Sequence, residues 1–170
     1  MPRPPAGLAL SVALLMAGCS GPGPAAGEPA PVPAGGSCRA VGGLPDRRCT
    51  PGEADPRVTP ANVAATICRR GYSASVRPSR DVSHAIKIRT SRAYGLQAVP
   101  FAQLELDHLV PLSIGGASTD RNLWPELRAG ASGAATKDAV EERLHREVCA
   151  GRIGLRAAQT AIARDWRTVR

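Results

Sequence analysis

Four cysteines constrain the fold of this chain more than any other feature. They form an even set in the part of the sequence that can fold: Cys38, Cys49, Cys68 and Cys149. The chain has only one Phe, two Tyr and two Trp, so its core must be built mainly from Leu, Ile, Val and Ala. A thin core of this kind gains stability from covalent cross-links. We therefore expect a small domain stabilised by disulfides.

Four cysteines can pair in three ways. We expect Cys38 to pair with Cys49, which closes a short loop, and Cys68 with Cys149, which joins an early helix to a late one. A zinc site is the alternative use of four thiols. It is disfavoured because the sequence has no Cys-x-x-Cys pair, the spacing typical of such sites.

The first 37 residues are unlike the rest of the chain. An apolar run from Leu8 to Met16 follows a weakly basic start, and it is too short to span a bilayer. Met16-Ala17-Gly18-Cys19 resembles the lipobox of bacterial lipoproteins, which implies a signal peptide over 1–18 and lipidation of Cys19. Ordinary secretion is the alternative. Residues 19–37 are rich in Gly, Pro and Ala and are expected to be a tether.

The folded part of the chain is basic. Residues 1–37 contain one Arg and one Glu, so the net charge of +8 belongs to the remainder. A basic domain attracts polyanions, although a solvated basic surface explains the charge equally well. Five basic residues are candidates for a phosphate-binding groove: Arg89, Arg92, Arg121, Arg128 and Lys137.

The order of the expected elements favours an α+β fold. Residues 38–58 are expected to form a segment bounded by a disulfide. We expect helices from Thr59 to Gly71, over 81–93, over 134–149 and over 155–166. Between the second and third of these helices, 103–108 alternates like a strand, and Leu123-Trp124 is expected to form a short second strand.

The stretch from Glu105 to Glu126, ELDHLVPLSIGGASTDRNLWPE, carries the residues that are hardest to explain by packing. Strand alternation places Glu105 and Asp107 on one face, about 7 Å apart, as a pair able to hold a divalent cation. His108 has a side chain whose pKa lies near neutrality, so it is able to deprotonate water. Asn122 closes the loop, and its amide is able either to fix the loop backbone or to orient a histidine ring.

These residues resemble the first half of an HNH endonuclease domain, the ββα-metal unit. Asp107-His108, Pro111, Gly115-Gly116 and Asn122-Leu123 match the family pattern in order and spacing. The resemblance covers about 20 residues and implies an HNH-like domain over 59–170, in which a small ββα-metal unit packs with additional helices.

The resemblance also implies roles for individual residues. Asp107 would be a metal ligand, His108 the general base, and Asn122 a residue that constrains the loop and orients His108. The cofactor would be one divalent ion (Mg, Mn, Ni or Zn), which stabilises charge on the scissile phosphate. The partner would be nucleic acid, DNA rather than RNA, with the membrane reached only through the lipid anchor.

The family's closing ligand is missing from its usual place between residues 127 and 136. The following helix offers Asp138, Glu141 and His145, which share an arc of about 60°. A surface pair of Glu141 and His145 is the alternative use of these residues.

Two functions therefore remain open. The first is an exported, lipid-anchored, metal-dependent nuclease that hydrolyses phosphodiester bonds. The second is a surface lipoprotein that keeps the scaffold as a polyanion-binding or structural module without catalysis. Proximity of Asp138, Glu141 or His145 to Asp107 would favour the enzyme.

Overall fold

The computed structural model describes Met1 and residues 36–169. The expected signal peptide, Cys19 and almost all of the expected tether lie outside the described residues. No helix in the described part of the chain combines the length and apolarity needed to cross a membrane.

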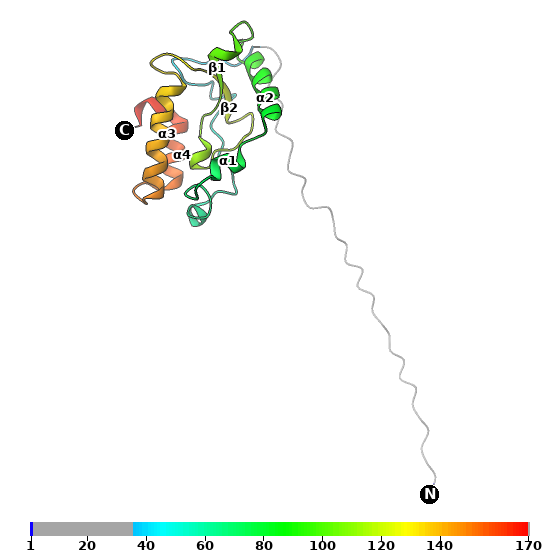
Figure 1. The fold of residues 1–170 in the computed structure, drawn as a ribbon, viewed down its shortest axis with the longest axis vertical. Helices are drawn as coiled ribbons and strands as arrows, with labels where there is room; N and C mark the ends of the chain where they lie inside the picture. Colours follow the sequence, from blue (N-terminus) through cyan, green and yellow to red (C-terminus); the bar gives the residue numbers. More distant parts are fainter. Residues whose placement is uncertain (2–35, 170) are drawn as a thin grey trace.

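The described residues form an α+β fold around a two-stranded antiparallel sheet. β1 (Leu104–His108) pairs with β2 (Leu123–Leu127). α2 (Arg80–Ala93) lies on one side of this hairpin, and α3 (Ala134–Cys149) and α4 (Leu155–Asp165) lie side by side on the other (Figure 1). The short α1 (Tyr72–Val76) lies below the hairpin in that view.

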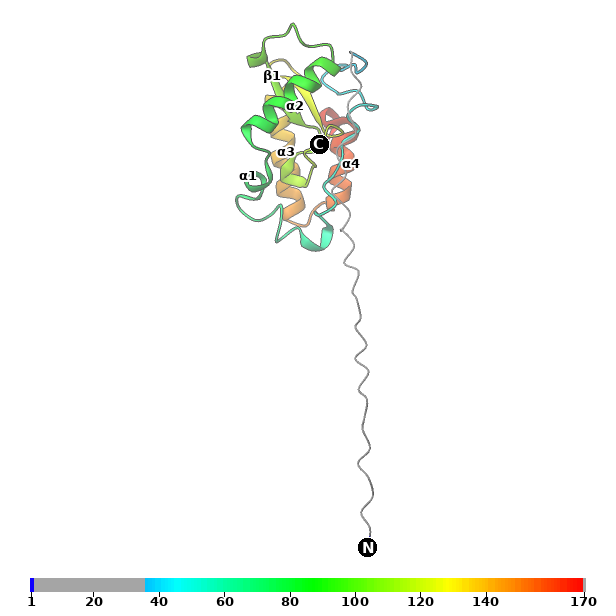
Figure 2. The same cartoon turned by 90° about the vertical axis from the view of Figure 1, so that its right-hand side faces the viewer.

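Four short 3-10 helices complete the fold. They are η1 (Pro60–Asn62), η2 (Phe101–Gln103), η3 (Leu112–Ile114) and η4 (Trp166–Thr168). η4 continues directly from α4, and residues 36–58 cross the molecule beside α4, on the side opposite α1 and α2 (Figure 2). The predicted α+β class is confirmed, and the predicted helices over 81–93, 134–149 and 155–166 form within one or two residues of their expected bounds.

The predicted helix from Thr59 to Gly71 is wrong. Only η1 forms there, and turns follow it. The two side-chain bonds of Asn62, from the Thr59 N–H and to Arg57 O, cap the first turn. Beyond that turn, Thr66 Oγ1 bonds back to Asn62 O, a contact that slightly destabilises helices, and the disulfide ties Cys68 to the end of α3. Gly71, with a φ of 83°, precedes α1 instead of ending a helix.

One core joins the elements. Trp124 from β2, Leu144 and Val148 from α3, and Ile162 from α4 pack in it, together with Val58 from the N-terminal segment. Leu and Val therefore fill much of the interior, as the composition predicts, but both tryptophans are buried as well.

Both predicted disulfides are present. Cys38 pairs with Cys49, and Cys68 pairs with Cys149. The first staples the N-terminal segment to itself. The second ties the turns after η1 to the last residue of α3, so it fixes a segment that has little regular structure of its own.

We predict that the two disulfides differ in their contribution to stability. Cys68→Ala/Cys149→Ala should lower the free energy of unfolding by on the order of 4 kcal/mol, because this link closes the longer loop in the unfolded chain. Cys38→Ala/Cys49→Ala, which opens the shorter loop, should cost about 3 kcal/mol. Urea unfolding of the oxidised proteins measures both values. A larger loss from the Cys38–Cys49 pair would contradict this ranking.

Candidate functional site

The register of the hairpin decides which side chains can meet. Asp107 lies opposite Trp124, and Glu105 lies opposite Glu126. Partners across an antiparallel pair point to the same side of the sheet, so these four residues share one face. His108 is the next residue along β1 and its side chain points to the other face.

A buried lysine occupies the centre of the Asp107 face. The Lys137 side chain, from the first turn of α3, has no exposed surface. Its Nζ lies 2.9 Å from Asp107 Oδ2, donates to His108 O at 2.9 Å, and forms an ion pair with Glu141 one helical turn further on. All three N–H groups of the ammonium therefore have partners. Trp124 Nε1 adds a hydrogen bond of 3.0 Å to Asp107 Oδ2.

Glu126 adds a third carboxyl group to this cluster. It is only 1% exposed, and neither of its carboxyl oxygens has a hydrogen-bond partner among the described residues. Burial, together with the nearby charge of Asp107, raises the pKa of Glu126 to about 9. The group is therefore protonated and neutral at pH 7. We call Asp107, Glu126, Lys137 and Glu141 the buried charge cluster.

In the remaining members of the buried charge cluster, the effects of burial and of neighbouring charges on the pKa values oppose one another. Burial raises the pKa of Asp107, and the Lys137 ammonium opposes that shift. Burial likewise raises the pKa of Glu141 to about 7, again against the pull of Lys137. Burial alone would lower the pKa of Lys137, but the two carboxylates outweigh it and raise the pKa above its ordinary value. Lys137 is therefore charged at any pH at which the protein is used.

The buried charge cluster does not fit a divalent cation. Within residues 36–169, no three Asp, Glu, His or Cys side chains are arranged to hold a metal ion. The physical obstacle is Lys137, because its ammonium stands between the Asp107 and Glu141 carboxylates, where a metal would have to bind, and would repel it. The structure thus brings Asp107 and Glu141 together, as expected for two ligands, but around an ammonium.

The other two expected metal ligands do not join the cluster. Asp138 is exposed on α3. His145 is directed elsewhere, with its Nε2 lying 3.0 Å from Ile67 O, near the Cys68–Cys149 disulfide. Glu141 lies one helical turn after Lys137 and so reaches the cluster. His145 lies two turns after Lys137 and so reaches the segment around Ile67 instead.

His108 lies almost buried at the end of β1. It is 8% exposed, and its Nε2 lies 2.9 Å from the Oγ of Ser118, a half-buried residue in the loop. Burial lowers the pKa of His108 to about 3, and the positive charge of Arg77 adds to that shift. The imidazole is therefore neutral at pH 7, with an exposed guanidinium nearby.

Asn122 holds the loop and does not contact the imidazole of His108. Its Oδ1 accepts a hydrogen bond from Val110 N, and its Nδ2 donates to Val110 O and Ala117 O, each at 2.8 Å. Both amide N–H groups are therefore occupied by backbone. Of the two roles considered for Asn122, bracing the loop is the one this geometry performs. Gly116 permits the close approach, because a Cβ there would lie 1.7 Å from Val110 O.

Three of the five basic residues considered for a phosphate groove are bound to carboxylates of the protein. Lys137 is buried, Arg89 pairs with Asp120, and Arg128 pairs with Glu105. Sequence reasoning missed Glu126, Ser118 and Arg77 as members of the site. The spacing of Lys137 and Glu141, four residues apart, was the available signal for an ion pair, but it did not indicate burial.

Comparisons with known proteins found no counterpart. No protein-family model matches the chain. Searches of curated proteins and of solved structures likewise gave no match.

We predict that Lys137→Met strongly destabilises the fold, by about 3–5 kcal/mol, because it leaves the Asp107 and Glu141 carboxylates buried without their ammonium. Arg146→Met is the matched control on the same helix. Arg146 also pairs with a glutamate four residues away, Glu142, but its side chain is 57% exposed, so the cost should be below about 1 kcal/mol. Chemical unfolding of both variants checks the contrast, and equal losses would contradict it.

Glu126→Gln should change how stability depends on pH. Between the ordinary value of 4.5 and about 9, the folded wild type holds a proton on Glu126 that the unfolded chain releases. Rising pH therefore destabilises the wild type across this window. Glutamine does not titrate, so the melting temperature of Glu126→Gln relative to wild type should increase from pH 5 to pH 9. The 74% exposed Glu142 provides the control Glu142→Gln, and parallel profiles for all three proteins would refute the assignment.

Proposed function

We propose that this chain is an exported, HNH-like hydrolase of phosphodiester bonds in nucleic acid, with His108 as the general base. The observation that carries the proposal is the placement of Asp107 and His108 at the end of β1, followed by a loop that Asn122 braces before β2 and α3. His108 is unprotonated at pH 7, as a base must be, but burial lowers its pKa to about 3, so it becomes an effective base only where substrate raises that pKa.

The order of elements supports the HNH-like assignment. Asp107-His108 end one strand, the Pro111 to Gly116 loop follows, and Asn122 leads into the second strand and then α3. The strand–loop–strand–helix order is that of a ββα unit. The two disulfides support an oxidising compartment and hence export, with Cys19 proposed as the lipid-bearing residue on the outer face of the membrane.

Arg77 gives the base a way to respond to substrate. Burial is the larger cause of the low pKa of His108, and the positive charge of Arg77 adds to it. A phosphate bound by Arg77 would neutralise that charge, which removes part of the depression and brings the pKa of His108 closer to the working pH. His108 would thus become a stronger base once the phosphodiester is bound. Lys137 is fully buried, so in this proposal it holds Asp107 and the backbone of His108 and does not touch substrate.

A specific observation favours the second candidate, a non-catalytic polyanion-binding module. Both oxygens of Asp107 already have protein partners, and so does Nε2 of His108. Groups that satisfy one another in this way are also what a purely structural cluster requires.

The two candidates are separated by His108→Ala. In the nuclease, cleavage of plasmid DNA should fall by about 100-fold or more, since only the base is lost, while affinity for the DNA stays within about twofold. His84→Ala is the control, because His84, on α2, packs its ring at a tilt against Phe101 of η2 and has no part in the proposed chemistry. Gel-based cleavage and fluorescence anisotropy measure the two quantities. DNA binding without cleavage by the wild type, in magnesium, manganese, nickel or zinc, would establish the non-catalytic module instead.

A further inference from the structure

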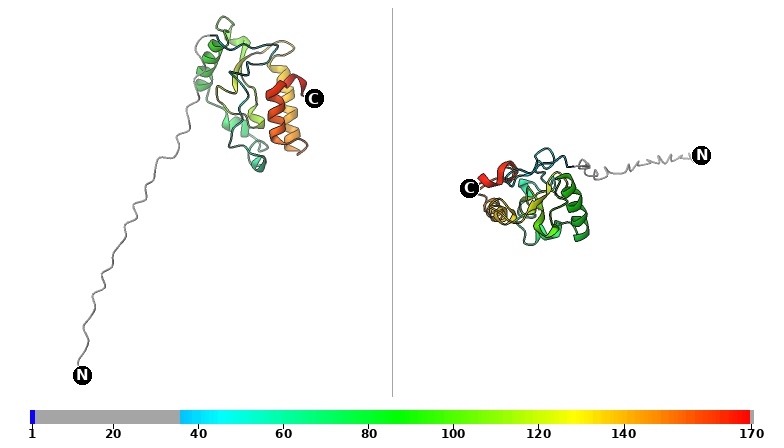
Figure 3. Two further views of the ribbon diagram at one scale, coloured as in Figure 1. Left: turned by 180° about the vertical axis from the view of Figure 1, so that it is seen from behind. Right: turned by 90° about the horizontal axis from the view of Figure 1, so that it is seen from above.

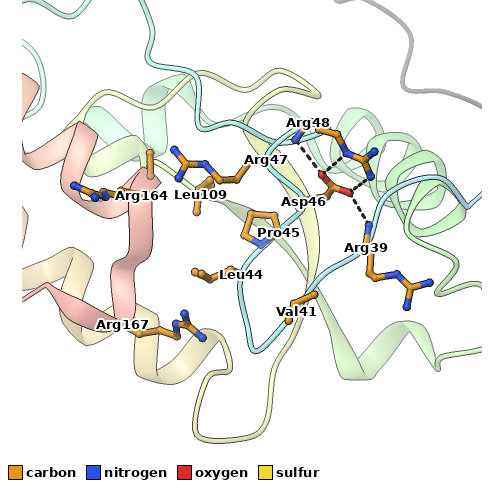
Figure 4. Close-up of a pocket in the computed structure, with 11 residues that line it drawn as sticks. Arg39, Val41, Leu44, Pro45, Asp46, Arg47, Arg48, Leu109, Arg164 and Arg167 are labelled. Atoms are coloured by element: carbon orange, nitrogen blue, oxygen red, sulfur yellow. Dashed lines mark hydrogen bonds and ion pairs between the residues drawn. The ribbon is translucent and has the colours of Figure 1, made fainter.

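A strongly basic concave surface of the described residues shares no lining residue with the buried charge cluster. A pocket of about 470 Å³ is lined by five arginines from two parts of the chain: Arg39, Arg47, Arg48, Arg164 and Arg167 (Figure 4). A second pocket, of about 360 Å³, shares Arg47, Ala163 and Arg164 with the first and adds Arg156. Together they form one continuous depression, which we call the arginine groove.

The walls of the arginine groove are fixed by packing. On one side the Cys38–Cys49 disulfide holds the segment that carries Arg39, Arg47 and Arg48. On the other side α4 presents Arg156 and Arg164. Figure 3 shows this segment and α4 together on the face seen from behind.

Close contacts lock these two walls together. Trp166 Nε1 donates to Gly43 O at 3.0 Å, and Arg167 Nη1 donates to Gly42 O at 2.8 Å. A Cβ on Gly52 would lie 2.6 Å from the Cβ of Ala163, so the backbone of the segment meets α4 directly. The groove is therefore preorganised.

Four arginines in the groove have charge available for a ligand. Asp46 neutralises Arg48 at 2.9 Å, and Asp165 neutralises Arg167 at 2.7 Å. The exposed side chains that pair with no carboxylate in the described part of the chain are those of Arg39, Arg47, Arg156 and Arg164. In Figure 4 the Arg47 and Arg164 side chains both lie around the same hollow. Guanidinium groups gathered in this way match the oxygens of phosphate.

We propose that the arginine groove binds the backbone phosphates of a single nucleic-acid strand. The shape favours a strand over a membrane, because the charges line a hollow, whereas a bilayer presents a flat surface. Val41, which is exposed, and Leu44, which is half-buried, supply apolar surface in the hollow, against which bases can lie. Leu109, which directly follows His108 in the chain, lines the bottom of the groove. The proposal rests on nucleic acid being the substrate class, but not on catalysis.

The test uses the full chain carrying Cys19→Ser, which removes the predicted site of lipid attachment. Binding of a fluorescein-labelled single-stranded 20-mer is followed by anisotropy across a salt series. Arg47→Gln/Arg164→Gln should weaken binding by roughly tenfold or more and reduce the slope of log K against log salt by about 1.4, the value for two lost phosphate contacts on a single strand. Arg69→Gln/Arg70→Gln, at two exposed arginines outside the groove, is the matched control with the same change in charge, and it should bind like the parent.

Several outcomes would overturn the proposal. Equal weakening in the two double variants would mean that net charge alone drives binding. Unchanged binding in Arg47→Gln/Arg164→Gln would place the strand elsewhere. Vesicles containing phosphatidylglycerol, compared with phosphatidylcholine, form a separate arm, and loss of vesicle binding without loss of oligonucleotide binding would assign the groove to a membrane. A groove that binds DNA in a chain showing no cleavage would leave this inference standing while the nuclease proposal fails.

Discussion

The ion pair between Lys137 and the carboxylates around it is the interaction on which the rest of the site depends. Lys137 joins the first turn of α3 to Asp107 and to the carbonyl of His108, so it links the helix to the end of β1. Because the ammonium is fully buried, it must keep these partners or lose several kcal/mol. The position of α3 against the hairpin, and the place where β1 gives way to the loop, are thus set by a charge and not by apolar packing alone.

Glu126 is the energetically unfavourable member of the buried charge cluster. An acidic side chain with two unpartnered oxygens is unfavourable in a core, and it persists here as a neutral acid, since burial raises its pKa to about 9. Deprotonation of this buried acid at high pH therefore destabilises the fold. The same cluster keeps one cation bonded to the backbone of the proposed base, His108, without exposing that cation to solvent.

Local pattern was sufficient for part of this structure. Strand alternation placed Asp107 and His108 on opposite faces, helical periodicity located α2, α3 and α4, and the cysteine pairing was correct. The helix expected after Thr59 stops after its first turn, where Thr66 bonds back to Asn62 O and a disulfide ties Cys68 to α3, contacts that helix propensity does not register. The burial of Lys137 was beyond sequence reasoning, because it depends on how α3 docks against the hairpin, and a lysine four residues before a glutamate is usually a surface pair.

The most direct measurement of this account is calorimetric titration of manganese into the wild type and Lys137→Ala at pH 7. If Lys137 takes the place of a divalent cation, the wild type shows no stoichiometric binding. Lys137→Ala, in which Asp107 and Glu141 face each other without the ammonium, then gains a manganese site and is stabilised by the metal. Stoichiometric binding of manganese to the wild type that is abolished by Asp107→Ala would contradict the account and restore a metal centre at this position.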